Sequence, residues 1–170
     1  MQDLNAPYRG VLFAGLMITK TGPKLIEFNA RFGDPETQVL MARLKSDIVT
    51  ILLAAAQGDI SGVNIEISDT AALCVVMAAN GYPGDYNKGT VIENIANAEK
   101  IAGINIFHAG TRLDNKGQLL ANGGRVLAVT ATGKTVLEAQ TNAYKAVDTI
   151  KWPDGFCRRD IGWRAISPSP

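Results

Sequence analysis

Residues 25–36 constrain the fold more than any other stretch, because one short segment combines a strand, a tight turn and a helix start. Side chains alternate between the two faces of a strand, so Glu27 and Asn29 are expected on one face. A carboxylate and an amide oxygen side by side suit a hard divalent cation such as Mg²⁺, which takes few protein ligands and adds water and phosphates. The alternative from these two residues alone is the polar face of a half-exposed strand.

The residues after this strand predict a short loop and then a helix. Asp34 suits the N-cap, Pro35 the first helical position, and Glu36 the positive end of the helix dipole. Arg31 lies in the loop beside Gly33, where a guanidinium can bind a carboxylate or phosphate through two hydrogen bonds. The alternative for Arg31 is an ion pair with Asp34 or Glu36 that only fixes the loop.

Apolar patterning predicts the neighbouring elements. Residues 10–18 and 24–29 are apolar runs separated by turn residues, so we expect them to pair as an antiparallel hairpin. The first run is nearly continuous, as expected of a strand covered on both faces. One helix follows the turn, and a second starts at Ser46 or Asp47 and ends at Gly58.

The sequence changes character between residues 58 and 66, where it becomes polar and glycine-bearing. We therefore predict two parts, residues 1–62 and 63–170. The second part is mostly antiparallel β, with one long helix that begins at a capping box of Thr135 and Glu138. Its predicted strands are residues 71–79, 103–110, 118–121 and 125–131. The predicted fold class is α+β.

The composition is that of a globular protein, with 46% hydrophobic and 19% charged residues. A formal net charge of +1 gives no general attraction to nucleic acid or to an anionic membrane, so we expect neither as a partner. No apolar run approaches the ~20 residues of a transmembrane helix. We therefore expect a cytoplasmic protein.

Residues 27–38, Glu-Phe-Asn-Ala-Arg-Phe-Gly-Asp-Pro-Glu-Thr-Gln, resemble the late active-site segment of the phosphoribosylamine–glycine ligases, a family of the ATP-grasp superfamily. The resemblance extends over practically the whole chain. Its other motifs are Phe-Ala-Gly-Leu-Met-Ile at 13–18, Val-Met-Ala-Ala at 76–79, Gly-Tyr-Pro-Gly-Asp-Tyr at 81–86, His-Ala-Gly-Thr at 108–111, Asn-Gly-Gly-Arg-Val-Leu at 122–127 and Cys-Arg-Arg-Asp-Ile-Gly-Trp-Arg-Ala-Ile at 157–166.

The resemblance implies the C-terminal half of an ATP-grasp domain, a hairpin plus two helices, followed by a small antiparallel β domain with one long helix. It implies ATP-dependent ligation of glycine to 5-phosphoribosylamine through a glycyl phosphate, a step of purine biosynthesis. By this resemblance Glu27 and Asn29 are ligands of Mg²⁺ or Mn²⁺, and Arg31 and Asp34 lie near the glycine and amine substrates. ATP is then a co-substrate.

Two departures from the family pattern bear on function. Gly15 stands where many other ATP-grasp enzymes have a further carboxylate ligand, as fits the glycine ligase branch. The chain also has no glycine-rich phosphate loop, no adenine pocket and no amino-terminal substrate domain. We therefore expect it to be inactive alone and to need the missing amino-terminal part of the same protein as its partner.

Two other functions stay open at this point. One is a carboxylating ATP-grasp enzyme such as biotin carboxylase, which shares the late metal-binding strand and a following β-rich domain. The other is a non-catalytic β-rich binding or interaction module, which the composition alone would allow.

Overall fold

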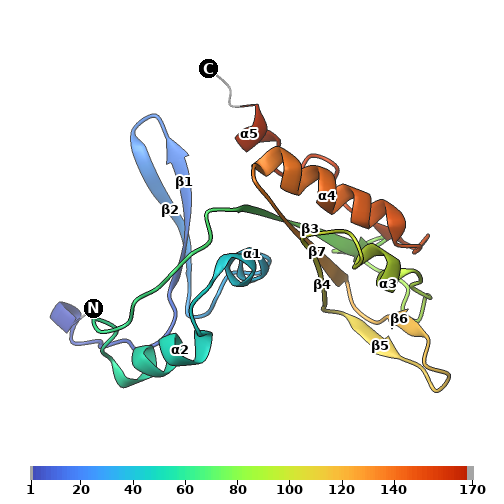
Figure 1. The fold of residues 1–170 in the computed structure, drawn as a ribbon. Helices are drawn as coiled ribbons and strands as arrows, with labels where there is room; N and C mark the ends of the chain where they lie inside the picture. Colours follow the sequence, from blue (N-terminus) through green and yellow to red (C-terminus); the bar gives the residue numbers. More distant parts are fainter. Residues whose placement is uncertain (1, 168–170) are drawn as a thin grey trace. The chain divides into compact units, whose positions relative to one another are not determined.

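The computed structural model describes residues 2–167, and the chain divides into two compact units (Figure 1). The first unit comprises the chain up to residue 37 together with residues 44–68. The second comprises residues 38–43 and the chain from residue 69 onward. The domain boundary at residues 62 and 63 stays a prediction, and each unit is considered by itself.

The first unit is built on the predicted hairpin. Strands β1 (Phe13–Thr19) and β2 (Gly22–Asn29) pair antiparallel, and a short 3₁₀ helix, η1 (Gln2–Leu4), precedes them. A β-bulge interrupts the register, because Leu16 pairs with Leu25 whereas Gly15 pairs with Glu27. Residues directly opposite each other share a face. The bulge therefore separates an apolar face beside Leu16 from the face that carries Glu27.

Two helices, α1 (Glu36–Arg43) and α2 (Ile48–Gln57), follow the hairpin. The predicted limits of α2 are confirmed: the Asp47 side chain accepts hydrogen bonds from two backbone N–H groups of the first turn, and Gly58 ends the helix with φ of 87°. The predicted start of α1 was wrong by one residue, since Pro35 precedes the helix. The reason is that residues 34 and 35 form a turn before the helix. The backbone N–H of Thr37 closes this turn by donating a hydrogen bond to the carbonyl of Gly33 at 3.1 Å.

The second unit contains a four-stranded antiparallel sheet in the order β4-β7-β3-β8 and a separate pair, β5 and β6. Strands predicted from the sequence are confirmed to within a few residues at each end, whereas β5, β8, α3 and α5 are short and were not predicted. The strands are β3 (Ala71–Ala79), β4 (Ile104–His108), β5 (Thr111–Leu113), β6 (Leu119–Ala121), β7 (Arg125–Gly133) and β8 (Gly155–Phe156). The helices are α3 (Ile95–Ala98), α4 (Val136–Thr149) and α5 (Trp163–Ile166).

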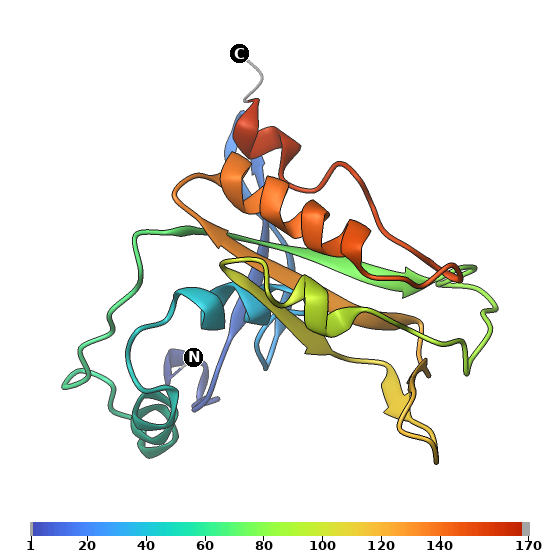
Figure 2. The same cartoon turned by 45° about the vertical axis from the view of Figure 1, so that its right-hand side comes forward.

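Helix α4 covers one face of this sheet and lies along β3 and β7 (Figure 2). Its start confirms the predicted N-cap, because the Thr135 hydroxyl accepts a hydrogen bond from the backbone N–H of Glu138. The helix buries small residues, Ala139, Ala143 and Ala146, which let it approach the sheet closely. At 14 residues it is the longest helix described, and no helix in the described part of the chain is long and apolar enough to cross a membrane.

The buried core lies in the second unit. Val75, Leu127 and Val129 are fully buried between the sheet and α4. In the first unit, among residues whose side chains the structure describes, only Gly33 is buried. Ile18 is 77% exposed, and most of the other large apolar residues of the hairpin are about half exposed or more, although Phe13 is half-buried. The expectation that residues 10–18 are covered on both faces was therefore wrong for this chain, because no packed layer of the first unit encloses the hairpin.

The position of the core makes a prediction for stability. Replacing Leu127 by Ala leaves a cavity between the sheet and α4, so we expect the free energy of unfolding to fall by about 2–5 kcal/mol. The matched change of Leu137 to Ala on the exposed side of α4 should cost less than about 1 kcal/mol. Urea denaturation followed by fluorescence of the buried Trp152 measures both, and equal losses would contradict this position of the core.

Candidate functional site

The structure brings Glu27 and Asn29 together on β2. The side-chain amide Nδ2 of Asn29 donates a hydrogen bond to Oε1 of Glu27 at 2.9 Å. Glu27 is exposed and Asn29 is half-buried, so the pair is open to solvent on one side. The two polar side chains therefore lie in contact at the end of the strand. Their role as metal ligands stays a prediction.

Gly15 lies directly across from Glu27 on β1 and leaves the space beside it free of a side chain. A Cβ atom built on Gly15 would lie 3.2 Å from Cγ of Glu27, which is tighter than an ordinary contact. In the sequence, only the family resemblance indicated that Gly15 lies beside the predicted metal ligands. A glycine within an apolar strand is nevertheless a general signal of a bulge or of a close approach to the backbone.

This donor set fits Mg²⁺ or Mn²⁺. Glu27 offers carboxylate oxygens, and rotation of the Asn29 amide turns its Oδ1 toward the position that Nδ2 now holds. Within the described residues there is no cluster of three or more His, Cys, Asp or Glu side chains that could hold a metal ion. A site with one carboxylate and one amide needs water and phosphate oxygens to complete its coordination, as is usual for Mg²⁺.

Arg31 and Asp34 lie in the short connection between β2 and α1. The Arg31 side chain is exposed and its Nη1 donates to the backbone carbonyl of Phe32 at 2.6 Å, which uses one of the five N–H donors of a guanidinium. Asp34 is also exposed. The connection is fixed at Gly33, whose carbonyl accepts hydrogen bonds from the backbone N–H and the hydroxyl of Thr37.

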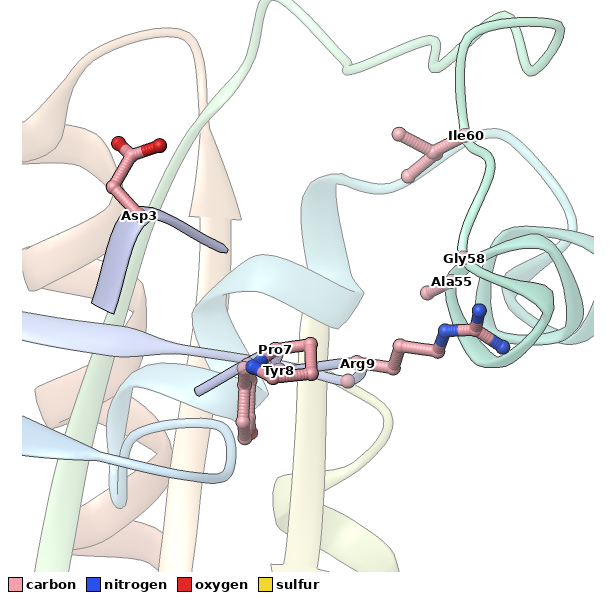
Figure 3. A pocket seen from close by; sticks show the side chains of 8 residues that line it. Asp3, Pro7, Tyr8, Arg9, Ala55, Gly58 and Ile60 are labelled. Carbon is pink, nitrogen blue, oxygen red and sulfur yellow. The ribbon is translucent and has the colours of Figure 1, made fainter. Parts of the chain in front are cut away.

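A cavity of about 600 Å³ lies elsewhere in the first unit, and none of the four predicted site residues lines it. Figure 3 shows the Arg9 side chain pointing toward Gly58 at the end of α2. A Cβ atom on Gly58 would lie 2.8 Å from Nε of Arg9, so the guanidinium is close to the carbonyl end of the helix, where a cation is favoured. This contact gives Arg9 a structural role. The lining residues are Asp3, Pro7, Tyr8, Arg9, Gly10, Ala55, Gly58 and Ile60.

Several pKa shifts involve the C-terminal segment and its contact with α4, and they have structural causes. Two hydrogen bonds from the Arg158 guanidinium lower the pKa of Asp160. Burial raises the pKa of the Tyr144 hydroxyl, which donates to the carbonyl of Arg158 and accepts from the N–H of Ile161. Burial likewise raises the pKa of the Cys157 thiol. The Tyr144 hydrogen bonds attach the segment to α4, so we assign it no substrate.

The glycine-rich loop at 81–86 has a packing role. The ring of Tyr82 covers Gly124, because a Cβ atom there would lie 2.2 Å from Cδ2 of the ring. Tyr82 also makes an edge contact with Tyr86, with ring centroids 6.3 Å apart. The loop is thereby held against the start of β7.

The fixed connection between β2 and α1 generates a prediction. A methyl group on Gly33 would lie 2.9 Å from Cβ of Glu36, so Gly33→Ala should shift the turn and weaken its hydrogen bond with Thr37. We expect amide exchange at Thr37 to become roughly tenfold faster or more, which corresponds to a cost of at least about 1.4 kcal/mol. Hydrogen-exchange NMR measures this rate.

Gly62→Ala in the same unit is the matched control, because nothing lies within 4 Å of its added methyl group. Unchanged exchange at Thr37 in the Gly33 variant would contradict the tight packing of this turn.

The chain is similar to known proteins along almost its whole length. Residues 72–164 match the family model of the phosphoribosylglycinamide synthetase C domain, and residues 1–37 match that of its ATP-grasp (A) domain. Phosphoribosylamine–glycine ligase of Mesorhizobium japonicum is 60% identical over 98% of this chain, and the chloroplastic ligase of Arabidopsis thaliana is 57% identical over 98%. The chain spans 39% and 32% of the length of these two relatives.

A solved structure shares the fold. The crystal structure of phosphoribosylamine–glycine ligase from Thermotoga maritima matches 94% of this chain and 38% of its own, with a TM-score of 0.78 and 34% sequence identity. The fold class predicted from the sequence is thereby confirmed as the C-terminal portion of this ATP-grasp ligase. Since the C-domain model alone matches more than half of the residues, the chain belongs to the phosphoribosylglycinamide synthetase family.

Proposed function

We propose that this chain supplies the metal-binding strand of an enzyme that joins glycine to 5-phosphoribosylamine with hydrolysis of ATP to ADP and phosphate, a step of purine biosynthesis. The observation that carries the proposal is the contact between Glu27 and Asn29 on β2, in a segment that matches the ATP-grasp family model. Family membership favours this reaction over a carboxylating enzyme or a non-catalytic binding module.

The reaction brings two anions together. The glycine carboxylate attacks the γ-phosphate of ATP, which forms glycyl phosphate and releases ADP, and the amine then attacks the acyl carbon and releases phosphate. Mg²⁺ or Mn²⁺ held by Glu27, Asn29 and phosphate oxygens would neutralise the negative charge that opposes the first attack.

The residues of this chain have distinct roles in the proposal. Glu27 contributes a charged oxygen ligand, and Asn29 a neutral one that also fixes the Glu27 side chain. Arg31 provides a planar donor that can hold a carboxylate or phosphate in line for attack. Asp34, in the same loop, would accept hydrogen bonds from an ammonium or amine group of a substrate, as the family resemblance implies.

The proposal also requires protein that lies outside these residues. Only residues 1–37 match the ATP-grasp domain model, and the chain spans at most about two fifths of the relatives described above. We infer that the amino-terminal part found in these relatives completes the ATP site, and that this chain alone does not catalyse. A cytoplasmic location remains part of the proposal, and one plant relative is named chloroplastic.

A chimeric ligase tests the function directly. In it, residues 1–170 replace the matching region of the Mesorhizobium japonicum relative, and glycine-dependent ADP release is measured. We expect activity in the chimera and a loss on the order of 100-fold or more with Glu27→Ala, because one carboxylate carries the cation's charged protein contact. Asn29→Ala should also lose activity, and raising the Mg²⁺ concentration should restore part of that activity.

Glu66→Ala is the matched control, since Glu66 is an exposed glutamate of the same unit. We expect it to leave the rate within about twofold of the unsubstituted chimera. Full activity of the Glu27 variant at low Mg²⁺ would overturn the metal role, and activity of the isolated chain would overturn the requirement for an amino-terminal part.

A further inference from the structure

We propose that Gly15 is a positioning residue for the cation site: because it lacks a side chain, Glu27 can lie across β1 and contact Asn29. The inference rests on the proposed function and deepens it, since it assigns a role in metal binding to a residue that has no functional group. Gly15 acts only through the position of the Glu27 side chain.

The register of the hairpin produces this arrangement. Leu16 pairs with Leu25, so regular pairing would place Gly15 opposite Ile26. The bulge instead places Gly15 opposite Glu27, on the same face. A Cβ atom on Gly15 would lie 3.2 Å from Cγ of Glu27 and 3.7 Å from a ring carbon of Phe13, so a larger side chain has no room unless Glu27 moves.

The backbone gives no other reason for a glycine at this position. Gly15 is not among the glycines with positive φ, so its conformation is one that other residues adopt readily. It also lies in the middle of β1, where glycine weakens a strand by roughly 0.5–1 kcal/mol relative to alanine. The space that Gly15 leaves for Glu27 is therefore the feature that distinguishes glycine from other residues here.

A larger side chain at position 15 should have opposite effects on the stability of the hairpin and on metal binding. Valine at position 15 suits a strand better than glycine, so pairing of β1 with β2 should persist or strengthen. The same side chain would displace Cγ of Glu27 and move its carboxylate away from Asn29. If Gly15 had only a structural role, substitutions at this position would weaken the hairpin and metal binding together.

The experiment uses this 170-residue chain with Mn²⁺ alone as the probe. Paramagnetic broadening of the Asn29 side-chain NH₂ signals reports Mn²⁺ bound beside Glu27, and cross-strand NOEs together with thermal unfolding report the hairpin. The variants are Gly15→Ala and Gly15→Val. Ala14→Val is the matched control, because Ala14 pairs with Phe28 on the opposite face.

We expect Gly15→Val to keep the cross-strand NOEs and to require roughly tenfold more Mn²⁺ for the same broadening, with Gly15→Ala between it and the unsubstituted chain. Ala14→Val should match the unsubstituted chain. Unchanged broadening in Gly15→Val, or loss of the NOEs in both Gly15 variants, would overturn the proposal. Glu27→Ala distinguishes failure of the proposed function from failure of this inference. If broadening persists in Glu27→Ala, Glu27 is not a metal ligand. If broadening is lost in Glu27→Ala but is unchanged in both Gly15 variants, only the positioning role of Gly15 is overturned.

Discussion

The pairing of Gly15 with Glu27 is the constraint on which the proposed site depends. It follows from one extra residue in β2, since the bulge shifts the register between Leu16 and Gly15. Without that shift Leu25, Glu27 and Asn29 would alternate onto one face, which would mix an apolar side chain with the two proposed ligands. With the shift, Leu25 lies on the same face as Leu16. Glu27 and Asn29 lie on the other face, where Gly15 is opposite Glu27.

The two units differ in how they are stabilised. The second unit buries a contiguous core between its sheet and α4, whereas the first buries almost nothing among its described side chains. The face opposite Glu27 carries Leu16, Ile18 and Phe28, each more than half exposed. Exposed apolar surface of this kind usually marks a contact surface. This agrees with the proposal that an amino-terminal part completes the first unit. The proposed metal ligands and this exposed apolar surface lie on the two faces of the same hairpin.

Local signals in the sequence predicted much of this fold. Asp47 and Gly58 delimit α2 as expected, and the cap at Thr135 starts α4, because capping depends on neighbouring residues only. The side-by-side placement of Glu27 and Asn29 followed from the alternation of a strand. Their role as metal ligands stays a prediction, which the donor types suggested and the family resemblance then favoured.

Other features depend on contacts between residues distant in sequence, and the sequence did not reveal them. The bulge at Ile26 arises from pairing across the hairpin, so periodicity along one strand could not show it. Strands β5 and β8 are only three and two residues long, and neither has the apolar run that predicted β6. The apolar run at residues 10–18 indicates that the strand needs cover, but it does not tell which segment provides that cover.

The position of the bound cation tests the proposed role of Glu27 and Asn29 most directly. Crystals of the chimeric ligase grown with Mn²⁺ and ADP would show the ion by anomalous scattering. We expect a peak within about 2.5 Å of a Glu27 carboxylate oxygen and of Oδ1 of Asn29, with Gly15 facing the same space. An ion bound by the nucleotide alone, with Glu27 and Asn29 turned toward different sides of the hairpin, would contradict it.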